Sequence, residues 1–223
     1  MAGRLLGLHL TTPGRQVGRA AEGRDRRAEA NVLEGAVGLF EFLMILVSVV
    51  IGLGLAEILT GGANLIRARD EVRFYWIHVA FQVGVFFALL QQWWELWDME
   101  SLGEISFVAV LAVLAPPIFL YLIANLLYPK QTERVNLEEY YFRQAPILWG
   151  LVIAGTLEGT FLQPLVFDEP ILHPANISGI PMVALCLVLA MSKSRRVHSV
   201  IAPLIMLMVL LDTILANPAI TAR

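Results

Sequence analysis

Two long stretches of this chain contain no lysine or arginine. One lies between Phe74 and Pro129 and the other between Gln144 and Ser192. Between residues 32 and 222, basic residues occur only in the short segments that flank these stretches, and the loops within the stretches carry acids instead. Such alternation is typical of membrane proteins, whose cytoplasmic loops are enriched in lysine and arginine. The pattern therefore predicts a chain that crosses a membrane repeatedly rather than one that folds around a soluble core.

The composition agrees with this prediction. The chain is 57% hydrophobic and only 16% charged, whereas a soluble domain carries about 25% charged residues. Its net charge of −3 is small, and its basic residues form no continuous stripe that would follow a phosphate backbone. The sequence therefore predicts a lipid bilayer as the main partner and no nucleic-acid partner.

Six apolar segments stand out, and a helix needs about 20 apolar residues to cross the hydrocarbon core. The fifth segment has only 15 residues, so it either spans thinly or pairs with the sixth as a tight hairpin. We predict an all-α, polytopic transmembrane helical bundle with about six spans. The predicted spans are Phe40–Thr60, Tyr75–Trp97, Ile105–Tyr128, Ala145–Phe167, Ile177–Met191 and Val197–Leu215.

The loops between these segments predict an orientation, because short basic loops remain in the cytoplasm. Acidic loops alternate with the basic loops along the chain, as six spans require. We therefore predict a multi-pass membrane protein with both termini outside. The basic residues are Arg67, Arg69, Arg73, Lys130, Arg134, Arg143, Lys193, Arg195 and Arg196, and the acids are Asp98, Glu100, Glu104, Asp168 and Glu169.

Aromatic residues mark both ends of the second predicted span. Tyr75 and Trp76 lie at its inner end, and Trp93, Trp94 and Trp97 lie at its outer end. The 18 residues from Trp76 to Trp94 correspond to about 27 Å of helix. Tyrosine and tryptophan are enriched at both membrane interfaces, so this spacing predicts a span that matches one bilayer core.

The N-terminal segment does not fit this orientation, because it is rich in arginine and would lie outside. We predict that residues 1–36 form a disordered extension, that residues 37–217 form the six-helix transmembrane domain, and that residues 218–223 form a short tail. The segment is a spurious extension upstream of a start near Val32, a removable targeting peptide, or a sign of inverted topology. Its six arginines are Arg4, Arg15, Arg19, Arg24, Arg26 and Arg27.

Three acidic residues lie inside the predicted spans: Glu57, Glu158 and Asp212. Ionisable residues are costly in a bilayer and usually face a protein interior or water. They form a candidate proton or cation site. The alternative is structural, since a protonated carboxyl also holds helices together through hydrogen bonds.

Small residues lie beside two of these acids. Gly52 and Ala56 form one small-x-x-x-small pair, and Gly155 and Gly159 form a second pair. Such faces let helices approach closely in lipid. We predict that the first and fourth spans pack through them, either together or across a homo-oligomer, unless these are ordinary membrane-helix glycines.

Motifs for catalysis or for cofactor binding are not apparent in the sequence, so we predict no catalytic residue, cofactor or metal site. The single cysteine, Cys186, lies in an apolar run, and we interpret it as a small buried or lipid-facing residue. His78 and His198 lie at matching depth near the cytoplasmic ends of their spans. We interpret them as snorkelling interfacial residues rather than as haem or metal ligands.

The run from Phe40 to Leu59 resembles the first span of small bacterial inner-membrane proteins of unknown function. The motifs Tyr75-Trp76-Ile77-His78 and Gln91-Gln92-Trp93-Trp94 are also similar. The resemblance covers about the first 100 residues and implies a bacterial inner-membrane location without a known activity.

Three functions remain open from the sequence. The first is a structural or regulatory membrane subunit that acts through helix packing, with a second copy or another membrane protein as its partner. The second is a small channel or proton/cation-coupled transporter that uses Glu57 and Glu158. The third is a membrane-embedded enzyme, for which only the intramembrane acids argue.

Overall fold

Every regular element in the computed structural model is a helix. The model describes residues 14–96, 106–130, 135–168, 170 and 179–216, and it describes side chains in these ranges except at 14–37, 39 and 212–216. The predicted all-helical fold is confirmed. The elements are α1 (Gly14–Arg67), α2 (Trp76–Glu95), α3 (Phe107–Leu126), α4 (Leu137–Leu157), the π-helical turn η2 (Glu158–Leu162), α5 (Gln163–Val166), α7 (Gly179–Met191) and α8 (Arg195–Ala216).

Three of the helices are long and apolar enough to cross a membrane: Phe40–Arg67 within α1, Phe107–Leu126, and Leu137–Val166. Their outer faces carry large exposed apolar side chains, such as Phe42 and Ile45, which are 61% and 67% exposed. A soluble protein rarely exposes so much apolar surface. These helices mark the chain as a membrane protein.

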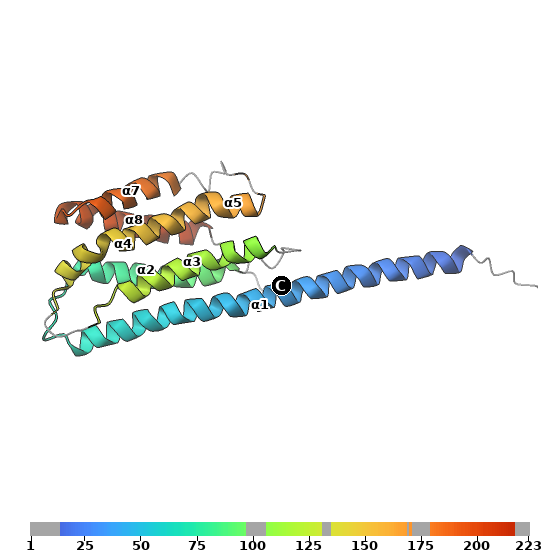
Figure 1. Ribbon diagram of the computed structural model, residues 1–223, viewed down its shortest axis with the longest axis horizontal. Coiled ribbons are helices and arrows are strands. Elements are labelled where there is room, and N and C mark those ends of the chain that lie inside the picture. Colours follow the sequence, from blue (N-terminus) through green and yellow to red (C-terminus); the bar gives the residue numbers. More distant parts are fainter. Residues whose placement is uncertain (1–13, 97–105, 131–134, 169, 171–178, 217–223) are drawn as a thin grey trace, which may run out of the picture.

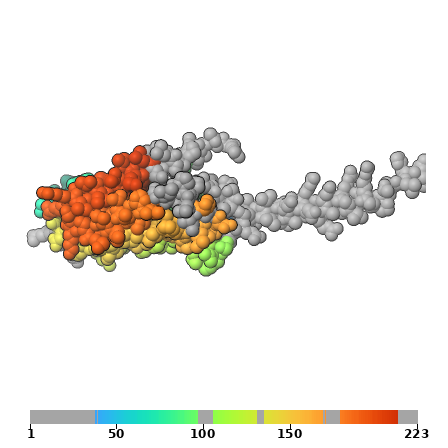
Figure 2. Space-filling view, turned by 90° about the horizontal axis from the view of Figure 1, so that it is seen from above, coloured from blue at the N-terminus to red at the C-terminus, as the bar shows by residue number. Residues whose placement is uncertain are grey.

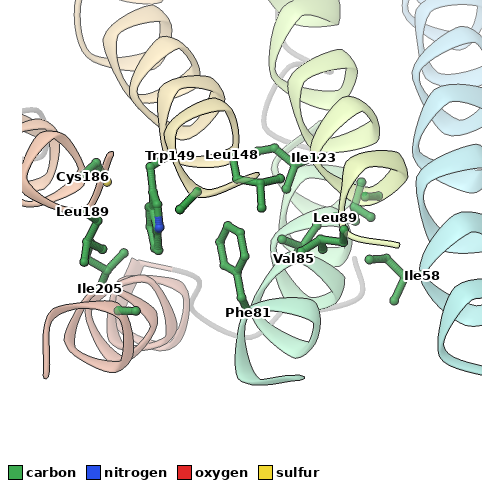
Figure 3. Close-up of a cluster of buried hydrophobic side chains, with 14 of the residues drawn as sticks. Ile58, Phe81, Val85, Leu89, Ile123, Leu148, Trp149, Cys186, Leu189 and Ile205 are labelled. Carbon is green, nitrogen blue, oxygen red and sulfur yellow. The ribbon is translucent and has the colours of Figure 1, made fainter. Parts of the chain in front are cut away.

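The helices lie side by side as a bundle (Figure 1), in which α1 packs against α3 and α2, α4 packs against α3 and α7, and α2 contacts α8. One hydrophobic core runs through it (Figure 3), and Phe81 of α2 stacks on Trp149 of α4 with ring centroids 4.8 Å apart. Side chains of α7 and α8, coloured orange to red, cover one face of the bundle (Figure 2).

The loops that carry basic residues meet at one end of the bundle, on the left in Figure 1. The Arg73 N–H donates to the Val135 carbonyl over 2.8 Å, and the Leu137 N–H donates to the Arg73 carbonyl over 3.0 Å. An ion pair joins Arg195, at the start of α8, to Glu138. The structure thus places the predicted cytoplasmic loops together, at what we call the basic end.

The first helix is longer than the sequence analysis predicted. It begins at Gly14, so residues 14–36 continue the apolar span as helix, while residues 1–13 lie outside the described residues. The division into extension, domain and tail stays a prediction. Residues 14–36 are rich in alanine, arginine and glutamate, which favour helix. No proline interrupts the chain between Gly14 and Arg67, so the helix continues from the apolar span into the polar segment. It projects well beyond the bundle (Figure 1).

Two further boundaries differ from the predicted spans. The fourth helix begins at Leu137 because the Asn136 side chain caps it, accepting a hydrogen bond from the Glu138 N–H over 3.2 Å. The weak fifth span is α7, which has only 13 residues. This length corresponds to about 20 Å, less than a bilayer core of about 30 Å. The predicted tail, residues 218–223, lies outside the described residues.

Candidate functional site

A buried network of hydrogen bonds links α4 to α8 near the basic end. The Tyr141 hydroxyl lies 2.9 Å from Nδ1 of His198, and Nε1 of Trp149 donates to the same hydroxyl over 3.1 Å. Nε2 of His198 lies 2.9 Å from the carbonyl oxygen of Ser192, just before α8. The Tyr141 and His198 side chains are fully buried, and that of Trp149 is 1% exposed. We call these three side chains the tyrosine network.

The direction of each bond in the tyrosine network follows from its partners. The Ser192 carbonyl only accepts, so Nε2 of His198 carries the hydrogen. In the neutral ring Nδ1 is then an acceptor, and the Tyr141 hydroxyl donates to it while its oxygen accepts from Trp149. Each polar hydrogen on the three side chains of the tyrosine network is therefore donated in a hydrogen bond. The tyrosine network therefore holds α4 and α8 together through buried hydrogen bonds.

A second buried histidine also contacts Tyr141. The ring of His78 on α2 meets that of Tyr141 edge-on, with centroids 6.1 Å apart. Both nitrogens of His78 are buried without a hydrogen-bond partner in the described residues, as are Nε2 of Gln82 and the hydroxyl of Tyr75. These three residues follow a single face of α2. This face was not among the predicted sites, although the four-residue spacing of His78 and Gln82 indicates it.

Both histidines correct the sequence-based interpretation. His78 and His198 are fully buried, so they are not snorkelling residues at the interface. They do lie at the same end of the bundle, and each contacts the Tyr141 ring, with centroids 6.1 Å away for His78 and 5.4 Å away for His198. Since both nitrogens of His198 are engaged in the tyrosine network, none is left for a metal or a haem while that network holds.

Glu158 is the one buried acid among the described residues, at 7% exposure. It begins the π-helical turn η2, and neither carboxylate oxygen has a hydrogen-bond partner within the described residues. The turn precedes Pro164, which has no N–H and whose ring clashes with the carbonyl four residues earlier in a regular α-helix. Widening the helix relieves that clash. Such π-turns are frequent at functional sites.

The other two candidate acids do not join Glu158. Glu57 is half-buried on α1, ten residues before Arg67, whereas Glu158 lies 21 residues after Leu137. Arg67 and Leu137 are both near the basic end, so the depths of the two carboxyls are about 15 Å and about 31 Å. Asp212 is in α8, but its side chain lies outside the described residues.

The small residues are placed differently in the two pairs. Gly52 and Ala56 lie on the exposed face of α1, and no other part of the bundle comes within 4 Å of a Cβ built at Gly52. A Cβ at Gly155 would meet Phe119 of α3 at 3.7 Å, while Gly159 faces open space. Within one chain α3 lies between α1 and α4 and contacts both. The direct packing that we predicted between the first and fourth spans is therefore replaced by contacts with α3. Packing across an oligomer stays a prediction.

The interfacial aromatics also divide into two groups. Trp76, Trp93 and Trp94 are 56%, 37% and 36% exposed, whereas Tyr75 packs on Tyr141 with ring centroids 5.7 Å apart. Tyr75 is thus part of the buried cluster around the tyrosine network. Trp97 lies outside the described residues.

An apolar groove of about 760 Å³ runs between α2 and α8, with α3 and α4 at its floor. Small residues on α2 create this space, and a Cβ at Gly84 would already touch Met206 at 3.4 Å. The volume lies in the range of small-molecule sites. Residues that line the groove include Ala80, Gly84, Ala88, Trp94, Trp149 and Met206.

No family model, curated protein or solved structure matches this chain. The candidate sites therefore depend on their geometry alone. Among the residues that the structure describes, no three histidine, cysteine, aspartate or glutamate side chains come together as a metal site. Cys186 is fully buried in the core, where it acts as a small apolar residue.

Proposed function

We propose that the protein is a structural or regulatory membrane subunit that acts through helix packing, with a second copy of the chain as its partner. The observation that carries this proposal is the open small-residue face of α1. Gly52 and Ala56 are exposed in the middle of a helix whose opposite face is buried through Val47, Ile51 and Ile58.

Self-association fits this face better than an unrelated partner does. A small-x-x-x-small pair is self-complementary, because two identical helices cross at it with their backbones in close contact. A two-fold axis through such a crossing makes the same patch serve both copies. The space around Gly52 is open in the single chain, so a second helix has room to approach there.

Transport through Glu57 and Glu158 has weaker support. Their carboxyls differ by about 16 Å in depth, and α3 packs between the helices that carry them. The tyrosine network, in turn, uses all its polar side-chain hydrogens in fixing helices to one another. Both observations favour a packing role over a conducting path.

The packing proposal predicts a cross-link at Gly52. In a Cys186→Ser background, Gly52→Cys places a thiol at the proposed crossing, where the two copies of residue 52 meet. We expect mild oxidation of native membranes to give a covalent dimer, resolved by non-reducing gel electrophoresis. Substitution Gly52→Leu is expected to shift the same protein toward monomer in dilute proteoliposomes, measured by single-molecule photobleaching.

The matched control is Gly150 on α4, which also faces open space in the single chain. Gly150→Cys and Gly150→Leu are expected to leave the monomer–dimer distribution unchanged. If Gly52→Cys stays monomeric, or if both glycines cross-link equally, α1 is not the dimer contact and the proposal fails.

The proposed location is the bacterial inner membrane, with the basic end in the cytoplasm. The membrane itself is proposed from the resemblance of the first predicted span, and the orientation is supported by the meeting of the basic loops at one end of the bundle. In the same Cys186→Ser background, a cysteine at Lys193 is expected to react with a membrane-impermeant maleimide only after a bacterial host is permeabilised. A cysteine at Asp168 is expected to react in intact cells. The reverse pattern of labelling would show the inverted orientation.

A further inference from the structure

Glu158 presents a chemical problem that helix packing does not solve. Its side chain is 7% exposed and both carboxylate oxygens lack a hydrogen-bond partner in the described residues. A charged carboxylate in apolar surroundings costs a large free energy unless it is paired. Between Gln144 and Ser192 the chain has no lysine or arginine to pair with it. The carboxyl is therefore either neutral or neutralised by a cation that the described side chains do not supply.

The backbone around Glu158 offers further oxygen atoms. In η2 the Gln163 N–H donates to the Glu158 carbonyl, one residue farther along than in an α-helix. Pro164 follows and supplies no N–H, so the turn has one backbone donor fewer than it has carbonyl groups. Carbonyl oxygens exposed by irregular helix turns are common ligands for Na⁺ and H⁺ in membrane proteins.

The turn is also closed by a neighbouring helix. Thr160 is buried, and a Cβ built at Gly179 would overlap its side chain, so the first residue of α7 lies directly on the turn. Any side chain at position 179 would push α7 away from η2. This contact covers the Thr160 side of η2, whereas Phe161 and Leu162 on its other side are 42% and 44% exposed.

We infer that Glu158 and the π-helical turn η2 form a binding site for a small monovalent cation, either a proton or Na⁺. The donors are a carboxylate and carbonyl oxygens, which suit hard cations rather than thiophilic or imidazole-binding metals. The site lies near the end of the bundle opposite the basic end, at a depth of about 31 Å from Leu137. It is independent of the α1 face, so either proposal stands if the other fails.

The test uses dicyclohexylcarbodiimide, an apolar reagent that adds to protonated carboxyl groups. The carboxyl oxygen bonds to the central carbon of the reagent, the acid proton moves to a nitrogen, and nothing leaves, so the peptide gains the mass of one reagent. We expect the full chain in Na⁺-free liposomes to acquire one adduct at Glu158, located by mass spectrometry of its peptides. Glu158→Gln is expected to abolish that adduct.

Two arms of the experiment distinguish the ions. For a proton site, labelling of Glu158 falls about tenfold per pH unit once the carboxyl ionises, and Na⁺ at constant ionic strength has no effect. For a Na⁺ site, adding Na⁺ in place of choline protects Glu158 at fixed pH. Glu57 is the internal control, because it is half-buried in an ordinary α-helix.

Three results would overturn the inference. The first is absence of the Glu158 adduct in Na⁺-free buffer across the whole pH range. The second is labelling that neither pH nor Na⁺ changes. The third is equal labelling and equal protection of Glu57 and Glu158. Circular dichroism of Glu158→Gln is expected to match the parent, and Glu158→Asp, which keeps the carboxyl, is expected to restore some labelling.

Discussion

Tyr141→Phe is expected to lower the free energy of unfolding by about 3 kcal/mol, although it removes a single oxygen atom. The hydroxyl both donates to Nδ1 of His198 and accepts from Nε1 of Trp149. Its loss leaves two polar groups buried without partners, and each costs about 1–3 kcal/mol. The phenyl ring fills the same space otherwise, so the loss reports the network rather than a cavity.

The measurement is reversible unfolding in mixed micelles, followed by circular dichroism as a denaturing detergent is added. Tyr140→Phe is a graded control, because the Tyr140 hydroxyl donates to the Leu126 carbonyl over 2.9 Å and its loss leaves no ring nitrogen unpaired. A loss of about 1 kcal/mol is expected there. Tyr121→Phe removes a hydroxyl from a half-exposed side chain on α3 and is expected to change little. Similar losses for Tyr141→Phe and Tyr121→Phe would contradict the role assigned to the network.

The helical bundle itself was predictable from the sequence, because the free energy of placing a residue in the membrane depends mainly on that residue and its neighbours in the sequence. A charge inside the hydrocarbon core is expensive wherever it occurs along a span, so uncharged runs indicate helices and basic residues indicate their ends. Six predicted apolar segments correspond to regions of α1, α2, α3, α4 with its continuation, α7 and α8. The meeting of the basic loops at one end follows from the same rule.

The tyrosine network was not predictable in this way. Tyr141 and His198 are separated by 57 positions, and hydropathy along a helix carries no information about which distant side chains meet. Both histidines lie near the cytoplasmic ends of their spans, and position along a span predicts only depth in the membrane. Depth alone favoured the snorkelling interpretation. Both histidines are buried instead against the Tyr141 ring, which comes from α4, a different helix from either of theirs.

The candidate site was predictable in part. The cost of burying an acid singled out Glu158, but Pro164 and the π-helical turn give that residue its setting. Glu57 was an equal candidate by the same criterion, but the structure leaves it half-buried in regular helix. Gly61 was not singled out, because the close approach that requires it comes from a tyrosine 67 positions away in the chain.

Gly61→Ala is expected to destabilise the bundle by about 2–3 kcal/mol, even though alanine is the better helix former. A Cβ at position 61 of α1 would overlap the ring of Tyr128, which follows α3. The ring has little freedom to move, because its hydroxyl donates to the Ile58 carbonyl over 2.9 Å. Accommodating the methyl group therefore requires α1 and α3 to separate or the hydrogen bond to break.

The neighbouring glycine provides a matched control for this substitution. A Cβ at Gly62 would meet only the Tyr128 hydroxyl, at 3.9 Å, which is an ordinary contact. Gly62→Ala is expected to be neutral or to stabilise by up to about 1 kcal/mol, through the lower conformational entropy of the unfolded chain. The same unfolding assay compares the two variants.

A second-site change separates the clash from a general effect of altering α1. Tyr128→Leu removes the ring, so Gly61→Ala in that background is expected to cost little, and the double-mutant cycle should give a coupling energy of about 1–3 kcal/mol. Coupling near zero would show that the two residues do not touch. In that case α1 and α3 would approach one another at a different place from the contact between Gly61 and Tyr128.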